Sequence, residues 1–258
     1  MKIYFLGSCS GTEPMPDRKH ESVVVEVNDK LYWIDAGEGC SYTAHNMGLD
    51  LLKVKHILIS HTHMDHVGGL GNLLWNIRKL VWRKEQQPVY GDVELYLPIK
   101  ETFDGFMQVL YNTEGLFKTE YKMNYHPVQN GVLFDDGNVK VTAIANTHLK
   151  KIETDKPLSF SYRLEAEGKS LVYSGDVGTY SDLDEAIGDG CDAIIIETGH
   201  FGVDVACEHF TAKKNIGKIF FNHHGREILN YPERSAEKVK NAFGENGAIC
   251  YDTMTVEL

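Results

Sequence analysis

The chain has 258 residues, of which 42% are hydrophobic and 24% charged, and its formal net charge is −11 at pH 7. This length allows one large domain or two small ones, and the composition is that of a globular protein. No apolar run reaches the roughly 20 residues that a membrane-spanning helix needs. The apolar part of residues 1–7 is also too short for a signal peptide. We therefore expect a cytoplasmic protein that does not contact a membrane.

The acidic balance argues against a long nucleic acid as a ligand, because its phosphates would be repelled at a distance. A small anionic substrate is compatible with the charge, since bound divalent ions reverse the local sign. The cysteines are odd in number and form no C-x-x-C pair, which favours a reduced compartment without a disulfide framework. They are Cys9, Cys40, Cys191, Cys207 and Cys250.

The first third of the chain predicts strands followed by a helix. Alternating and β-branched residues indicate strands at 2–6, 22–27 and 31–34, with a hairpin turn at 28–30 between the last two. A short helix is expected at 41–47, ending near Gly48. Residues 84–135 carry the least information. We expect a strand at 94–97, a helix at 102–111 and a strand at 121–126 there.

Three histidines and an aspartate lie within six residues directly after the apolar run 56–59, which reads as a buried strand. They are His61, His63, Asp65 and His66, and the helix-like segment 67–83 follows them. Imidazole and carboxylate groups are typical ligands of zinc, iron and nickel. Donors this close in sequence can serve two adjacent ions, so the segment predicts a metal site on a loop at a strand end.

Later predicted strands also end in polar side chains. The strand 139–145 leads to His148, and the strands 160–164 and 170–173 lead to Ser174-Gly175-Asp176. The buried strand 193–197 leads to His200, and 218–221 leads to His223 and His224. Helices are expected at 203–215 and 234–243, with closing strands at 248–251 and 254–256.

The H-x-H-x-D-H pattern resembles the signature of the metallo-β-lactamase superfamily. The opening loop with Gly7, Ser10 and Gly11, and the later Asp35-Ala36-Gly37-Glu38-Gly39, are similar to the ribonuclease Z-like and phosphodiesterase branch. This resemblance implies an α/β fold, a four-layer αβ/βα sandwich of two mixed β-sheets flanked by helices. It implies one such domain over residues 1–258.

The resemblance also implies a set of ligands for two divalent ions, with zinc preferred and manganese or iron compatible. His61, His63 and His148 would bind one ion, Asp65, His66 and His223 the other, and Asp176 would bridge them. His223 fits the register better than His224. Asp65 and His200 are expected to take part in catalysis, His200 through the leaving group. Asp35, Glu38 and Glu197 are candidates for orienting the ligand histidines.

A hydroxide that bridges the two ions is the expected nucleophile, and a small phosphodiester such as a cyclic nucleotide is the leading substrate. A large nucleic acid is judged an unlikely partner, because only a short hairpin without a glycine-rich arm separates His148 from Asp176. The alternatives are a thioester, lactone or β-lactam hydrolase, and a metal-binding sensor that has lost catalysis. A diiron reductase would carry glutamate at His63, and a persulfide dioxygenase would lack much of the second ligand set. A homodimer is left open.

Overall fold

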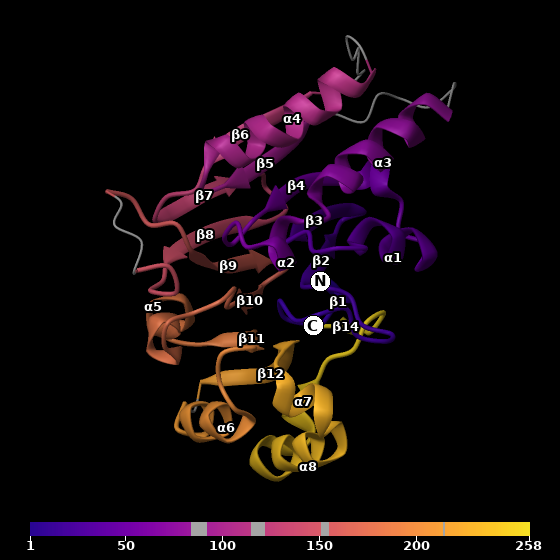
Figure 1. The fold of residues 1–258 in the computed structure, drawn as a ribbon. Helices are drawn as coiled ribbons and strands as arrows, with labels where there is room; N and C mark the ends of the chain where they lie inside the picture. Colours follow the sequence, from indigo (N-terminus) through magenta and orange to yellow (C-terminus); the bar gives the residue numbers. More distant parts are fainter. Residues whose placement is uncertain (84–91, 115–121, 151–154, 214) are drawn as a thin grey trace.

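The computed structural model describes residues 1–83, 92–114, 122–150, 155–213 and 215–258, and its strands form two seven-stranded sheets (Figure 1). In each sheet three neighbouring strand pairs are antiparallel and three are parallel. The first sheet has the order β14 (Thr255–Glu257), β1 (Lys2–Gly7), β2 (Ser22–Val27), β3 (Lys30–Ile34), β4 (Val54–Leu58), β5 (Val93–Leu97) and β6 (Met123–Pro127). The second has β13 (Gly247–Ile249), β12 (Ile216–His224), β11 (Cys191–Thr198), β10 (Lys169–Tyr173), β9 (Phe160–Ala166), β8 (Lys140–Ala145) and β7 (Gly131–Asp135).

Helices cover the outer face of each sheet, so the predicted four-layer sandwich of two mixed sheets is confirmed (Figure 1). The first sheet packs against α1 (Cys40–Asn46), α3 (Leu70–Arg83) and α4 (Lys100–Glu114). The second packs against α5 (Asp184–Ile187), α6 (Val203–Thr211) and α8 (Pro232–Phe243). Short elements complete the chain: α2 (Met64–Val67), α7 (Arg226–Asn230) and 3-10 turns at Leu51–Lys53, Tyr180–Leu183 and Gly244–Asn246. No helix in the described part of the chain is long and apolar enough to cross a membrane.

The central strands are apolar on both faces because each face meets another layer. In β11, Ala193 and Ile195 enter the core between the two sheets, while Ile194 and Ile196 face the helices α6 and α8. In β3, Tyr32 points between the sheets and Trp33 toward the helices. This two-sided burial explains why these strands read as continuous apolar runs in the sequence.

Four differences from the sequence predictions bear on the fold. The expected helix 67–83 is split into α2 and α3, because the backbone N–H of Gly69 donates to Ala36 at 2.7 Å and the chain bends there. The helix expected at 203–215 ends at Thr211, and the strand β7 was not predicted. The strand expected at 121–126 runs from Met123 to Pro127, and its predicted first residue lies outside the described residues.

Candidate metal centre

The predicted ligands meet at one edge of the sandwich, where the carboxyl ends of several strands come together (Figure 1). The early cluster follows β4, His148 follows β8, Asp176 follows β10, and His223 lies near the end of β12. β4 pairs in parallel with its neighbours, as do β10 and β12 with β11. Strand ends of one direction share an edge, which is where α/β proteins commonly place functional groups.

One set of donors consists of His61, His63, His148 and Asp176, whose ligand atoms all lie within 4.8 Å of one another. His63 Nδ1 is 2.9 Å from His61 Nε2 and 3.3 Å from His148 Nε2. Asp176 Oδ2 lies 3.6 Å from His61 Nε2 and 3.7 Å from His148 Nε2. These are the four residues that the sequence assigned to the first ion and its bridge.

A second set of donors consists of Asp65, His66 and His223. His223 Nε2 lies 3.1 Å from His66 Nε2 and 3.1 Å from Asp65 Oδ2. The other oxygen of Asp176, Oδ1, is 3.2 Å from His66 Nε2 and 3.3 Å from His223 Nε2. Asp176 therefore presents one carboxylate oxygen to each set.

The donor sets fit divalent cations. Four ligands at zinc bond lengths of roughly 2.0–2.1 Å around one ion stand about 3.3–3.4 Å apart in a tetrahedron, close to the separations in both sets. Asp176 is 2% exposed, and its Oδ1 has no hydrogen-bond partner among the described residues. A buried carboxylate oxygen left in this way is expected of a metal ligand.

His66 is oriented by Asp35, as the sequence suggested. Asp35 Oδ2 lies 2.7 Å from His66 Nδ1, so the imidazole proton belongs on Nδ1 and Nε2 is left free for a metal. Ser60 donates to both oxygens of Asp35, from its backbone N–H and from Oγ, each at 2.7 Å. Although burial opposes the charged form, the carboxylates of Asp176 and Asp35 hold the pKa of His66 well above its usual value in the metal-free chain.

His200 lies at the edge of the second set and is paired with Glu197. Its Nδ1 is 3.0 Å from Glu197 Oε2, and its backbone N–H donates to the same oxygen at 3.0 Å. The hydrogen bond that His200 donates to Glu197 raises the pKa of His200. Glu197 also lies in one group of candidate ligands with Asp176, His200 and His223. The structure therefore brings His200 to the donor atoms.

Of the remaining sequence candidates, Glu38 is exposed and lines a separate hollow beside Gly39. His224 turns away from both sets, because its Nε2 bonds to the carbonyl of Phe221 at 2.9 Å. Burial lowers the pKa of His224 to about 3. The preference for His223 over His224 thus agrees with the geometry.

Two glycines leave space for the donors. A Cβ on Gly199 would lie 2.6 Å from His223 Nδ1, and one on Gly175 would lie 2.8 Å from the carbonyl of Phe160. Gly175 also has a φ of 56°, which side-chain-bearing residues rarely adopt. The Ser-Gly-Asp turn therefore needs glycine in order to place Asp176.

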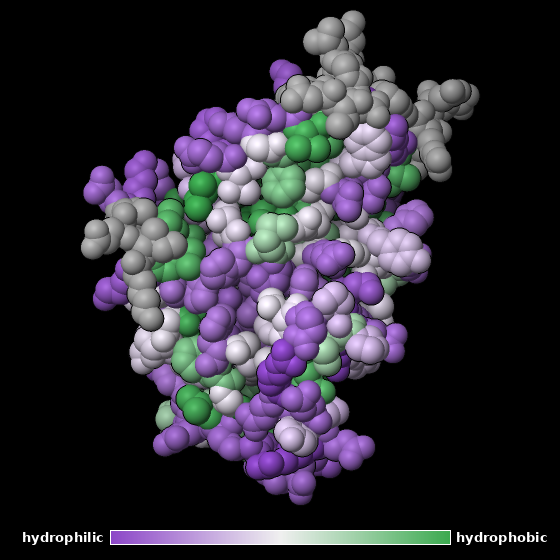
Figure 2. All heavy atoms as spheres, in the orientation of Figure 1, coloured by the Kyte–Doolittle hydropathy of each residue, from purple (hydrophilic) through white to green (hydrophobic). Residues whose placement is uncertain are grey.

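A pocket of about 630 Å³ opens over the donor sets. Its wall carries Glu13 and Arg226, whose side chains are joined by two hydrogen bonds of 2.9 and 2.6 Å. Figure 2 shows a mainly hydrophilic surface around the middle of the face that Figure 1 presents. Sequence reasoning missed this pair, because neither residue belongs to a motif. The full lining is Ser10, Gly11, Thr12, Glu13, His63, Met64, Asp65, Asp176, Gly199, His200, His223 and Arg226.

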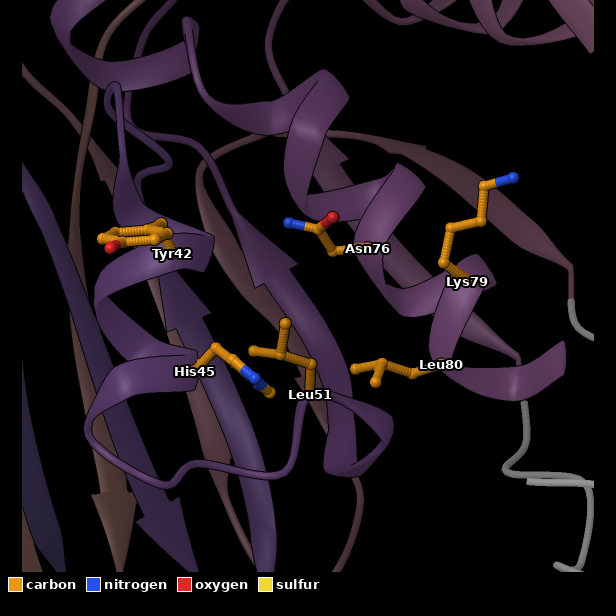
Figure 3. Close-up of a pocket in the computed structure, with 6 residues that line it drawn as sticks. All are labelled: Tyr42, His45, Leu51, Asn76, Lys79 and Leu80. Carbon is orange, nitrogen blue, oxygen red and sulfur yellow. The ribbon is translucent and has the colours of Figure 1, made fainter. Parts of the chain in front are cut away.

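A second hollow, of about 340 Å³, lies between α1 and α3 (Figure 3). Leu51 and Leu80 give it an apolar floor, and Tyr42, His45, Asn76 and Lys79 surround it. It contains no carboxylate and shares no residue with the donor sets. The metal chemistry therefore belongs to the pocket over Asp176.

Comparisons with known proteins place this geometry in a family. Residues 1–203 match the family described as Anti-Pycsar protein Apyc1. The chain belongs to the Apyc1 family. One sequence relative of this Apyc1 family member is a ribonuclease Z of Methanothermobacter thermautotrophicus, which is 27% identical over 150 residues. The matched region covers 57% of this chain and 45% of that protein. A ribonuclease Z of Picrophilus torridus is 25% identical over 295 residues, covering 93% of this chain and 91% of that protein.

Solved structures share the fold of this Apyc1 family member over nearly its full length. Human tRNase Z, short form, has a TM-score of 0.74 at 19% identity and covers 100% of this chain and 99% of its own. The metallo-β-lactamase fold protein YhfI from Bacillus subtilis has a TM-score of 0.73 at 15% identity, with 99% of both chains covered. A diphosphatase of the PhnP family has a TM-score of 0.67 at 18% identity, covering 100% of this chain and 97% of its own. These neighbours share the metallo-β-lactamase fold with the chain, and the sequence relatives named above are ribonucleases Z.

The comparisons overturn one expectation. The sequence analysis judged a large nucleic acid an unlikely partner, and this judgement is wrong, because the relatives named above are ribonucleases Z and a tRNase Z. The reasoning relied on the net charge of the whole chain and on the short hairpin between His148 and Asp176. Charge summed over the surface does not describe a site whose bound cations reverse the local sign.

Proposed function

We propose that the chain is a phosphodiester hydrolase that works with two divalent ions and acts on a small phosphodiester, such as a cyclic nucleotide. The main support is Asp176, whose Oδ2 faces one set of imidazoles and whose Oδ1 faces the other at 3.2 and 3.3 Å. A carboxylate shared in this way is suited to two neighbouring cations. Zinc is the preferred metal, because imidazole supplies most of the donors.

In this proposal His61, His63 and His148 hold one ion, and Asp65, His66 and His223 hold the other. When bound, the ions would supply a hydroxide nucleophile at neutral pH and polarise the phosphoryl oxygen. The chain's own groups prepare that chemistry. Asp35 fixes the proton of His66 on Nδ1, so that Nε2 is available as a donor.

His200 is the proposed source of the proton for the leaving oxygen. Its ring lines the pocket, and Glu197 both orients the ring through Nδ1 and raises the pKa of His200. A raised pKa favours the protonated imidazole, the form that general acid catalysis requires. Glu197 is 1% exposed, so its carboxylate is held in a fixed position beside the half-exposed ring of His200.

The pocket supports a substrate of nucleotide size. Its volume of about 630 Å³ lies within the range of typical ligand sites. Arg226 provides cationic N–H donors at its wall, in a lining that also includes the carboxylates of Asp65 and Asp176. Guanidinium groups suit phosphate and nucleobase oxygens because their donors are planar and fixed.

Processing of an RNA 3′ end is the second candidate function, and the ribonuclease Z relatives favour it. Both candidates break a phosphodiester bond with the same donor sets, so they differ only in what the pocket mouth accepts. The structure leaves the pocket open to solvent through exposed side chains such as Met64, which is 71% exposed.

The test offers three substrates to the purified chain loaded with Zn²⁺ or Mn²⁺: a 3′,5′-cyclic nucleotide, bis-p-nitrophenyl phosphate, and an RNA with a 3′ extension. Asp65→Asn removes a donor at nearly constant shape. Asp189→Asn, at an exposed position outside the pocket, is the matched control.

We expect turnover of both small esters, its loss in Asp65→Asn and its retention in Asp189→Asn. Cleavage of the RNA without turnover of the small esters would replace the first candidate by the second. An absence of turnover with all three substrates would contradict the hydrolase assignment and favour a metal-binding protein without catalysis.

A further inference from the structure

Glu21 is a buried carboxyl group beside the donor sets that neither the sequence motifs nor the proposed reaction uses. It is 1% exposed and directly precedes β2. Its backbone carbonyl accepts a hydrogen bond from the N–H of Gly37 at 3.0 Å, which fixes it against the loop after β3. A buried polar group of this kind needs hydrogen-bond partners, and Glu21 has partners on two sides.

On one side Glu21 binds β12 next to a proposed ligand. Asn222 Nδ2 donates to both carboxyl oxygens of Glu21, at 2.7 and 2.9 Å. The next residue is His223, whose φ of 48° lies in the left-handed region that non-glycine residues rarely adopt. The contact between Glu21 and Asn222 therefore holds the chain at the point where the backbone turns His223 toward the second donor set.

On the other side Glu21 reaches a second proposed ligand through two groups. The hydroxyl of Tyr173 lies 3.2 Å from Glu21 Oε1 and 2.7 Å from Asp35 Oδ2. Asp35 in turn holds His66 through Nδ1. A continuous series of contacts thus joins His66 of the first sheet to His223 of the second, with Glu21 at its centre.

Counting protons gives the direction of these bonds. The hydroxyl of Tyr173 carries one hydrogen, and the shorter contact assigns it to Asp35. Asp35 accepts bonds from Ser60 N, Ser60 Oγ, His66 Nδ1 and Tyr173, three of them at Oδ2. The same Tyr173 hydroxyl is also within hydrogen-bond distance of Glu21 Oε1, so the hydroxyl lies between the two carboxyl groups. Burial raises the pKa of Glu21 to about 7.

We propose that Glu21 is a positioning residue that couples the orientations of His66 and His223 through its contacts with Tyr173 and Asn222. The inference rests on the proposed metal site, but it concerns ligand geometry and not turnover. If the hydrolase proposal fails while metal still binds, the role of Glu21 remains open to measurement.

The experiment measures metal affinity and coordination in the full chain with Glu21→Gln, Glu21→Ala and a matched control. Zn²⁺ affinity is determined by competition with a chelator, and the visible spectrum of the Co²⁺-loaded chain reports ligand geometry. Glutamine keeps the size of the side chain and one acceptor oxygen for Asn222, whereas alanine keeps neither. Tyr32→Phe is the control, because it removes a buried hydroxyl that bonds Asp136 at 2.7 Å away from the donor sets.

We expect Glu21→Gln to keep the affinity and the spectrum of the original chain. Glu21→Ala should lose about 10- to 100-fold in affinity for Zn²⁺, the usual effect of removing a group that orients metal ligands, and should change the Co²⁺ spectrum. Tyr32→Phe should change neither quantity.

Wild-type affinity and spectrum in folded Glu21→Ala would overturn the proposal, as would equal losses in the glutamine variant or in Tyr32→Phe. If Glu21→Ala does not fold, Tyr173→Phe takes its place, since it breaks the link to Asp35 while leaving Glu21. A lowered affinity there supports the coupling, and an unchanged affinity contradicts it.

Discussion

Two residues at this site each keep ligand atoms available for a metal ion. Asp176 keeps one oxygen for each donor set, and His66 keeps Nε2 because Asp35 occupies Nδ1. Despite burial, His223 and His66 hold the pKa of Asp176 well below its usual value, so this carboxylate stays ionised. In the metal-free chain, the imidazoles therefore compensate the negative charge of Asp176. A bound cation would take over this role.

Arg226 allows a test of substrate recognition at the scale of one residue. Its side chain lines the pocket and pairs with Glu13 at the surface, where such a pair contributes little to stability. We expect Arg226→Gln to raise KM for a small phosphodiester about tenfold with kcat nearly unchanged, because one charged hydrogen bond to the substrate is lost. Steady-state kinetics measures both quantities.

Arg234→Gln is the matched control, since Arg234 is exposed on α8 and does not line the pocket. Its KM should equal that of the original chain. If Arg226→Gln also leaves KM unchanged, Arg226 does not contact the substrate.

The donor residues could be predicted from the sequence because they occur in dense motifs or directly after apolar strands. The pattern from His61 to His66 needs no tertiary information, and His148 and Asp176 follow recognisable strands. Glu21, Tyr173 and Arg226 could not be found in this way. They lie apart in sequence, and only the packing of the two sheets brings Glu21 within 3.2 Å of Tyr173.

Among the elements, the break between α2 and α3 depends on close backbone contact. A Cβ on Gly69 would lie 2.1 Å from the carbonyl of Gly37, and the Gly69 N–H donates to Ala36. We expect Gly69→Ala to lower the free energy of unfolding by about 2 kcal/mol and to weaken metal binding, because the displaced loop carries Asp65 and His66. Urea unfolding and chelator competition measure the two effects.

Gly105 is the control for that substitution. It is exposed within α4, and a Cβ there would meet nothing within 4 Å. Alanine favours the helix over glycine, so Gly105→Ala should stabilise the chain by about 0.5–1 kcal/mol. A Gly69→Ala variant as stable as the original chain would show that the contact with Gly37 is not limiting.

His56 on β4 gives the fold a pH-dependent element away from the metal site. Its ring stacks on Phe134 at 3.9 Å between centroids and on Tyr32 at 5.5 Å, and neither ring nitrogen has a hydrogen-bond partner among the described residues. Burial lowers the pKa of His56 to about 4, although Asp136, with Oδ2 at 3.7 Å, opposes the shift. Glu94 raises this pKa slightly, while Lys55 and His126 lower it.

The pKa of His56 in the folded chain lies below its value of about 6.5 in the unfolded chain. The neutral ring therefore contributes fully to the free energy of unfolding above pH 6.5, and this contribution is lost as the pH falls toward about 4. The full loss amounts to about 3 kcal/mol. We expect His56→Phe to remove this part of the pH dependence, as measured by urea unfolding of the metal-free chain at pH 4.5 and 7. The exposed His45→Phe should leave it in place, and equal slopes in all three chains would contradict the account.

For the whole molecule, the sandwich was predictable from alternating strand patterns together with the family resemblance. The extra strand β7 was missed because its residues are partly exposed and lack a regular apolar pattern. The partner class was misjudged because net charge is a property of the entire surface, while recognition depends on one edge. The two sheets matter to function because each contributes ligands to the same site.

The central claim is that donors from both sheets bind two cations that together support phosphodiester hydrolysis. Its most direct test is a titration of the metal-free chain with Zn²⁺ while the hydrolysis of bis-p-nitrophenyl phosphate is followed. The account predicts that the rate rises from zero and levels off at two equivalents of metal per chain. A rate that levels off at one equivalent, or no turnover at any ratio, would contradict it.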